Sequence, residues 1–98
     1  MKQWLYVLRP TRAGMPEDPT PEESAAVGRH FEYLQSLLAA GRLIIAGRTL
    51  EEESFGIAVF EAESEEEARV IVSGDPAVRE GVMTAVLHPY RVALLRGE

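Results

Sequence analysis

The sequence has no cysteine, and its 98 residues include only two histidines and two aspartates. Without cysteine the chain has no disulfide bond, no thiol nucleophile and no thiolate metal site. No apolar run is long enough to cross a membrane, and the amino-terminal residues become charged too early for a signal peptide. We therefore expect a cytoplasmic protein that does not bind membranes.

Positive charge is also scarce, because 16 acidic residues outweigh 10 basic ones and leave a net charge of -6. Nucleic acids and anionic membranes bind basic surfaces, so we expect no nucleic acid as a partner and no membrane. The apolar content of 46 % is ordinary for a globular protein. The length predicts one domain over residues 1–98, with a core so small that oligomerisation would stabilise it.

Sequence motifs for cofactors are missing as well. The glycines form neither a GxGxxG fingerprint nor a Walker loop, and no GxSxG nucleophile elbow occurs. His30 and His88 do not form a short-spaced ligand pair, so a metal site made by both with Asp75 is the weaker alternative. We therefore expect no cofactor and no metal.

The most informative segment, residues 20–47, has the pattern of a capped helix that turns into a buried strand. Thr20, Pro21 and Glu23 have the identities and spacing of a capping box with proline in the first turn. Gly41 is the expected left-handed stop. His30 lies at the edge of the predicted inward-facing stripe. Apolar residues at helical spacing form that stripe: Val27, Phe31, Leu34 and Leu38.

Four strands and two further helical segments complete the predicted order. We expect strands over residues 3–8, 42–48, 55–62 and 84–95, the last interrupted at His88-Pro89. A second helix is expected over residues 64–72, followed by a helical turn over residues 75–80. The β-α-β-β-α-β order predicts a ferredoxin-like α+β fold, with both helices on one face of a four-stranded antiparallel sheet.

The predicted strands are apolar on both faces. Within residues 55–62, for example, Ile57 and Val59 point one way while Ala58 and Phe60 point the other. The helices cover only one face, and soluble monomers rarely expose a large apolar patch. We therefore expect a homodimer formed through the uncovered face of the sheet.

Residues 11–19 form a long polar loop, which is either a lid or a plain surface loop. Arg9 and Arg12 flank this loop at the end of the first strand. Each guanidinium is suited to bind an anionic substrate, most simply a carboxylate through a bidentate contact. The alternative is surface solvation or a salt bridge to a glutamate, and this alternative is favoured for Arg12.

His30 and Asp75 are the residues best suited to acid-base chemistry. In a ferredoxin-like fold, the middle of the first helix and the turn after the second lie toward one end of the sheet. Asp75 would fix the tautomer of His30, and His30 would act as general acid or base near neutral pH. The alternative is structural, with His30 as a satisfied core residue and Asp75 as a simple helix cap.

The chain also resembles the YciI-like (YCII-related) proteins over nearly its whole length. This resemblance rests on His30-x-x-Tyr33-Leu34-x-x-Leu37-x-x-x-Gly41, on Asp75-Pro76 and on the closing His88-Pro89-Tyr90. It implies a dimeric ferredoxin-like α/β barrel in which His30 and Asp75 form the active-site pair. We also assign Tyr90, which closes the pattern, to substrate binding.

The resemblance further implies small-molecule chemistry. Related members include a dehalogenase that acts on chloromuconolactone, and the fold is similar to that of muconolactone isomerase. This chain departs from the family pattern at two positions: Arg48 stands where proline is frequent, and Ala77 where an aromatic residue is frequent. The change at Ala77 would alter the shape of the pocket.

Together these observations predict an enzyme of unestablished reaction that acts on a small anionic or lactone-like molecule. His30 would abstract a proton beside a carbonyl, isomerisation or elimination would follow, and Arg9 would lie near the anionic group. The alternative is a non-catalytic module that binds a small molecule or accompanies another enzyme, with His30 in a structural role.

Overall fold

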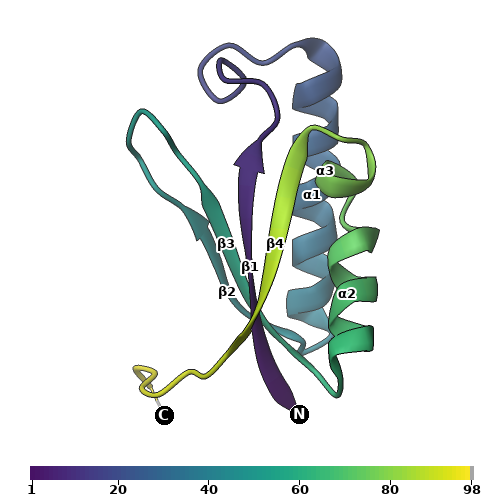
Figure 1. Ribbon diagram of the computed structural model, residues 1–98, viewed down its shortest axis with the longest axis vertical. Helices are drawn as coiled ribbons and strands as arrows, with labels where there is room; N and C mark the ends of the chain where they lie inside the picture. The colour runs from purple at the N-terminus through teal and green to yellow at the C-terminus, as the bar shows by residue number, and fades with distance from the viewer. Residues whose placement is uncertain (98) are drawn as a thin grey trace.

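The chain folds into a single sheet covered on one side by helices (Figure 1). A computed structural model describes residues 1–97. The strands form an antiparallel sheet in the order β2-β3-β1-β4, and the ferredoxin-like α+β fold expected from the sequence is confirmed. The elements are β1 (Lys2–Pro10), α1 (Pro21–Ala39), β2 (Leu43–Arg48), β3 (Gly56–Ala62), α2 (Glu65–Gly74), α3 (Pro76–Arg79) and β4 (Met83–Tyr90).

The long helix α1 begins and ends as its sequence predicts. The Thr20 hydroxyl accepts a hydrogen bond from Glu23 N, and the Glu23 carboxylate accepts one from Thr20 N. These two bonds complete the capping box. Beyond the last helical residue, Gly41 has a φ of 75°, the left-handed conformation that ends many helices.

The inward face of α1 differs from the predicted apolar stripe. Phe31 and Leu38 are 61 % and 58 % exposed, whereas Glu23, Ala26 and Leu34 are buried. Positions 23, 26, 30 and 34 follow helical spacing, so residue 30 belongs to the inward face itself and not to its edge. Glu23 is tolerated on this inward face because its carboxylate is paired with Arg12 of the preceding loop.

Two strand boundaries also differ from the prediction. β4 runs without interruption through His88-Pro89 and ends at Tyr90 instead of residue 95. Pro89 is tolerated because β4 is an edge strand, where a missing N–H donor need not break a ladder bond. β1 extends through Pro10, which pairs with Met83 at the end of the ladder.

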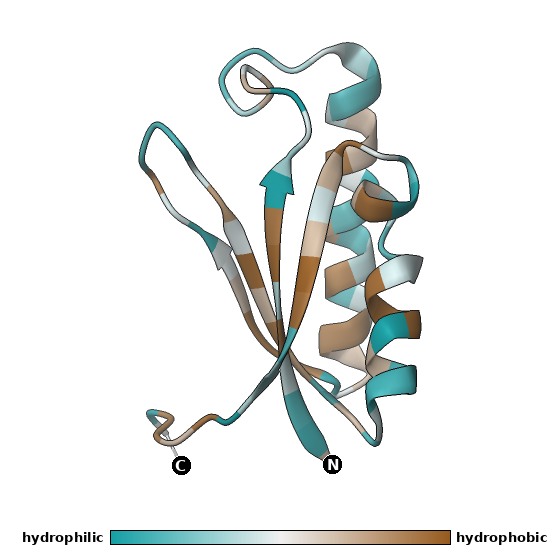
Figure 2. Ribbon diagram, viewed as in Figure 1, coloured by the Kyte–Doolittle hydropathy of each residue, from teal (hydrophilic) through white to brown (hydrophobic). Residues whose placement is uncertain are grey.

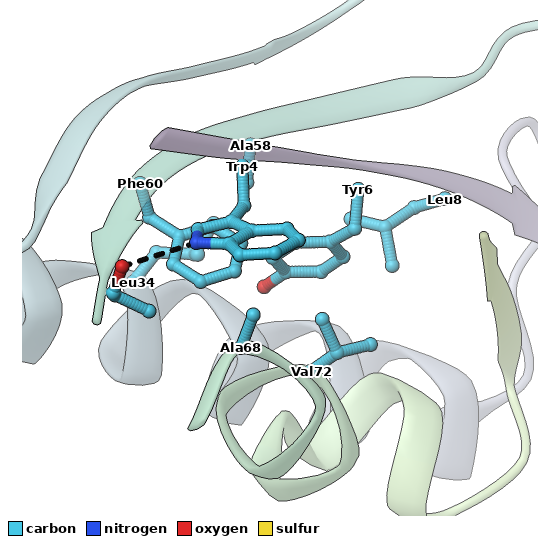
Figure 3. Close-up of a cluster of buried hydrophobic side chains, with 9 residues drawn as sticks. Trp4, Tyr6, Leu8, Leu34, Ala58, Phe60, Ala68 and Val72 are labelled. Carbon is cyan, nitrogen blue, oxygen red and sulfur yellow. Dashed lines mark hydrogen bonds between the residues drawn. The ribbon is translucent and has the colours of Figure 1, made fainter. Parts of the chain in front are cut away.

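The hydrophobic core fills the space between the sheet and the helices (Figure 3). Trp4 donates a hydrogen bond from Nε1 to the carbonyl oxygen of Ala62 at 3.1 Å. Tyr6 meets Phe60 edge to face, with ring centroids 5.7 Å apart. The buried cluster joins both layers: Trp4, Tyr6, Leu8, Leu34, Ala58, Phe60, Ala62, Ala68 and Val72.

None of the helices formed by residues 1–97 covers the other face of the sheet, and this face is also apolar (Figures 1 and 2). Strand register places Leu5, Val7, Ile57 and Val86 on this face, opposite to the core. Ile45 and Val86 are each 55 % exposed. Both faces of the sheet are therefore apolar, as the strand sequences predict. No helix formed by residues 1–97 is long and apolar enough to cross a membrane.

Candidate active site

Asp75 ends one helix and begins the next. Its backbone has φ −66° and ψ 123°, so the chain leaves α2 at this residue and enters α3 at Pro76. The side chain caps the new helix, because Oδ1 accepts a hydrogen bond from Ala77 N at 3.0 Å. Asp75 is fully buried at this break. A buried carboxylate requires further hydrogen-bond donors.

His30 on α1 is one of these donors. Its Nδ1 lies 2.8 Å from Oδ1 and 2.7 Å from Oδ2 of Asp75. The His30 side chain is 12 % exposed, whereas the Asp75 side chain has no exposed surface. The structure thus brings together the predicted pair, although 45 residues separate the two in sequence.

Tyr6 on β1 is a further donor, and the sequence predictions did not include it. Its hydroxyl donates to Oδ2 of Asp75 at 2.8 Å. Burial raises the pKa of the Tyr6 phenol, and the Asp75 carboxylate raises it further, so the hydroxyl keeps its proton. Strand alternation places Tyr6 on the core face, but no local signal links it to an aspartate 69 residues later.

The hydrogen bonds around Asp75 determine which nitrogen of His30 is free. Donors from Tyr6, His30 and Ala77 hold both carboxylate oxygens in place. When Nδ1 donates its proton to Asp75, Nε2 retains a lone pair. Within residues 1–97, Nε2 makes no hydrogen bond, and no fully buried side-chain nitrogen or oxygen lacks a partner. Nε2 is therefore accessible and able to accept a proton.

His30 lines a cavity of about 540 Å³ between α1, the loop after β1 and the adjoining ends of β2 and β3. A cavity of this size suits a small organic molecule, for which pockets of about 300–1,000 Å³ are typical. Asp75 is not part of the lining and occupies Nδ1, so Nε2 is the ring nitrogen left for a ligand. Most of the wall is apolar: Leu8, Val27, Phe31, Leu34, Phe55, Ile57 and Met83.

The loop of residues 11–19 covers this cavity. Met15, Pro16 and Pro19 belong to the lining, and Met15 is only 4 % exposed. Arg12 ties the loop to α1, because its guanidinium donates to both carboxylate oxygens of Glu23, at 2.9 and 2.7 Å. This guanidinium lowers the pKa of Glu23 to about 2. The salt bridge favoured for Arg12 is confirmed, and the loop is anchored over the cavity.

Arg9 and Tyr90, which the sequence assigns to substrate binding, do not line the cavity. The guanidinium carbon of Arg9 lies 4.8 Å from the ring centroid of Phe55, which does line it. Tyr90 pairs with Gln3 at one end of β4, and the cavity residue Met83 lies at the other end of that strand. Within one chain, Arg9 is therefore next to the cavity wall and Tyr90 is at the far end of the sheet.

The second histidine is remote from this site. His88 pairs with Leu5, which faces away from the core, whereas His30 lies on the helical side of the sheet. Residues 1–97 contain no group of three His, Cys, Asp or Glu side chains placed to hold a metal ion. The weaker alternative of a metal triad made by His30, His88 and Asp75 is therefore wrong.

The fold and the site together define a class of protein. It comprises ferredoxin-like α+β proteins in which a histidine lines a cavity and its ring is hydrogen-bonded to a buried aspartate. Within that class, the chain belongs to the YCII-related family, because the YCII-related domain matches residues 6–87. No curated protein sequence matches the chain.

Solved structures with the same fold include two enzymes. A 5-chloro-2-hydroxyhydroquinone dehydrochlorinase from Burkholderia phenoliruptrix AC1100, in complex with 2,5-dihydroxybenzoquinone, is 21 % identical with a TM-score of 0.66. That match covers 90 % of this chain and 93 % of the dehydrochlorinase chain. SnoaB, a cofactor-independent oxygenase from Streptomyces nogalater, is 14 % identical with a TM-score of 0.54, and all of both chains is covered. At these identities the likeness establishes the fold alone.

Proposed function

We propose that this protein is an enzyme that transfers protons on a small molecule, with His30 as general acid and base. Asp75 orients His30 and fixes its tautomer. One observation supports the proposal most strongly: His30 lines a cavity of about 540 Å³ while its Nδ1 is bonded to the buried Asp75 carboxylate. An imidazole held in this way offers Nε2 to a ligand as a proton acceptor.

The proposed reaction begins at a carbon beside a carbonyl group of a small carboxylate or lactone. Nε2 of His30 takes the proton, the C–H electron pair moves toward the carbonyl oxygen, and an enolate forms beside the imidazolium. Asp75 stabilises the imidazolium through its bond to Nδ1.

Two outcomes are open to the enolate. Return of the proton from Nε2 to another carbon gives isomerisation. Expulsion of a leaving group from the neighbouring carbon gives elimination, after which Nε2 loses its proton to solvent. The dehydrochlorinase among the structural neighbours supports elimination, since loss of hydrogen chloride is a reaction of this kind.

A non-catalytic binding module is the second candidate. The observation that favours it is the scarcity of reactive groups, because within residues 1–97 His30 is the only side chain of the lining suited to proton transfer near neutral pH. In this candidate the cavity binds a small molecule, and Asp75 serves only as a helix cap and an anchor for His30.

The first experiment measures the tautomer of His30 by ¹H–¹⁵N NMR of its ring, above neutral pH, in the wild type and in Asp75→Asn. We expect the Nδ1–H tautomer in the wild type and its loss in the variant. His88 is an internal control, because it lies on the opposite face of the sheet from Asp75. A wild-type His30 that carries its proton on Nε2 would contradict the proposal.

The second experiment separates the enzyme from the binding module. Lactones and cyclic carboxylates with acidic C–H bonds are incubated in deuterium oxide, and proton exchange is followed by NMR. We expect catalysed exchange by the wild type and by His88→Gln, and none by His30→Gln. Binding without exchange across the panel would favour the non-catalytic module.

We also propose that the protein is a homodimer formed through the bare sheet face. The support is the exposed apolar surface at Ile45 and Val86, which a partner would bury. Sedimentation equilibrium at micromolar concentration is expected to give twice the chain mass of 10.8 kDa. A mass equal to that of the single chain would overturn this part of the proposal.

A further inference from the structure

The charge of the cavity lining is opposite in sign to that of the chain. The chain has 16 acidic residues and a net charge of -6, but none of the aspartates and glutamates within residues 1–97 lines the cavity. Among the described residues, Arg48 is the one permanently charged side chain in the lining, and His30 is the only other ionisable one. The cavity is therefore an apolar space with a local positive charge, a combination that suits an anion with an apolar body.

Arg48 forms no salt bridge within residues 1–97, whereas four of the nine arginines are each paired with a glutamate. Arg12, Arg29, Arg42 and Arg69 each form a salt bridge with a glutamate. In the part of the chain described by the structure, no carboxylate lies within salt-bridge distance of Arg48. The acidic turn at residues 51–53 follows closely in sequence, but none of its side chains lines the cavity. Arg48 is exposed to solvent at this position, so its guanidinium is available to an anionic ligand.

The helix and the sheet supply different groups to the cavity. His30 lines it from α1, whereas Arg48 lines it from the last position of β2. Apolar side chains of α1 such as Val27 and Leu34 form the wall with them. Arg9 stays outside, stacked on the cavity residue Phe55 at 4.8 Å, where its charge adds to the positive potential.

We propose that Arg48 is a specificity-determining residue that binds the anionic group of a cyclic substrate, whose apolar ring lies in the cavity beside His30. The anionic group is a carboxylate or an acidic ring hydroxyl, which a guanidinium binds through two parallel N–H donors. This inference rests on the proposed function in one respect, that the substrate occupies the His30 cavity. It predicts that molecules with an anionic group bind more tightly than neutral cyclic molecules of the same shape.

The test uses benzoate as the probe and benzamide as its neutral counterpart of similar size. Affinities are measured by NMR titration of the full-length protein, with the His30 ring signals showing that the probe enters the cavity. We expect benzoate to bind the wild type more tightly than benzamide. In Arg48→Met we expect about a tenfold loss for benzoate, as for one charged hydrogen-bonded contact, and little change for benzamide.

Three variants separate a direct contact from a general charge effect. Arg96→Met removes the same charge from the carboxyl-terminal segment outside the cavity, and we expect no change. Arg9→Met removes a charge near the wall, and we expect a smaller loss than for Arg48→Met. Arg48→Lys keeps the charge without the planar fork, and we expect partial recovery.

Several results would overturn the inference. The first is the absence of saturable benzoate binding, the second is equal affinity for benzoate and benzamide, and the third is unchanged benzoate affinity in Arg48→Met. A loss in Arg96→Met as large as in Arg48→Met would also refute a direct contact. Circular dichroism of each variant checks the fold, and unchanged benzamide affinity shows that the cavity of Arg48→Met is intact.

The two proposals fail in different ways. If benzoate binding depends on Arg48 while no compound shows proton exchange, the enzyme proposal is wrong and the anion site stands. If exchange depends on His30 while Arg48→Met changes neither benzoate binding nor exchange, the anion site is wrong and the acid-base role stands.

Discussion

Replacing Tyr6 by phenylalanine removes one hydrogen bond from the buried carboxylate of Asp75. The aromatic ring and its edge-to-face contact with Phe60 are kept, so the change is confined to the hydroxyl. Both Tyr6 and Asp75 have no exposed surface, and water cannot take the place of the lost donor. A hydrogen bond to a charged group contributes about 1.5–3 kcal/mol, and we expect a loss of unfolding free energy of about 2 kcal/mol.

The assay is urea denaturation. All variants are measured at one protein concentration, because the apparent stability of a dimer depends on concentration. For a domain of this size, about 2 kcal/mol corresponds to a shift of the urea midpoint of about 1–2 M. His30 still bonds to Asp75 in the variant, so its ring tautomer is expected to be unchanged. The loss of stability and the retained tautomer together identify Tyr6 as a support of the carboxylate.

Tyr33→Phe is the matched control. The Tyr33 hydroxyl donates at 2.6 Å to the neutral carbonyl oxygen of Ile71 and does not bond to Asp75. A neutral hydrogen bond contributes only about 0.5–1.5 kcal/mol, so Tyr33→Phe should cost less than Tyr6→Phe. Equal costs for the two variants, or a Tyr6→Phe protein as stable as the wild type, would refute this account of how Asp75 is held.

Three further predictions concern the loop anchor, the bare sheet face and the end of α1. The pKa of Glu23 falls from 4.5 to about 2 on folding, so the folded state binds fewer protons and its salt bridge stabilises the protein fully above pH 4.5. Thermal denaturation should therefore show that Glu23→Gln lowers Tm at pH 7, and that the difference from the wild type shrinks as pH falls toward 2. Val86→Arg should yield monomers in sedimentation, whereas Val70→Arg, at a residue 65 % exposed on α2, should not. Urea denaturation should show that Gly41→Ala lowers the unfolding free energy by about 1–2 kcal/mol, because φ at Gly41 is 75°. Gly28→Ala should raise it by about 0.5–1 kcal/mol, because Gly28 lies within α1 and an added Cβ would meet no other atom.

Signals that act over a few residues predicted most of the fold. The capping box at Thr20 and Glu23, the glycine stop at Gly41 and the Asp75-Pro76 start of α3 are all where the sequence predicts them. Each is a contact between near neighbours in sequence, so residue identity and spacing are sufficient to predict it. The order of these elements then leads to the ferredoxin-like sheet.

The strand error at the carboxyl terminus has a cause that lies elsewhere in the chain. Residues 92–95 are apolar enough to predict a strand, but β4 pairs with β1, and its last residue, Tyr90, faces Gln3. β1 begins at Lys2, so residues beyond Tyr90 have almost no partner strand left. Leu94 is accordingly 94 % exposed. The end of a strand depends on its partner's length, which local sequence does not contain.

The same dependence on distant residues explains what was missed at the site. Tyr6 reaches Asp75 only because α3 begins under the core face of β1. Arg9 follows the cavity residue Leu8 by one position, and strand alternation turns it to the other face. Arg48 reaches the cavity because the end of β2 pairs with the start of β3, at Gly56. The sequence indicates which residues are reactive, and the pairing of strands decides which of them meet.

Asp75 has a structural and a chemical role that a single substitution can separate. In Asp75→Asn, the amide oxygen can still accept from Ala77 N, so the cap of α3 is kept. The amide nitrogen, in the place of Oδ2, is a donor, and facing Nδ1 of His30 it would favour the tautomer with the proton on Nε2. Nε2 would then be unable to accept a proton from a ligand, as in other histidines whose aspartate partner becomes an amide. A folded Asp75→Asn protein that still binds ligand but has lost proton exchange would therefore assign the chemistry to the carboxylate and not to the cap.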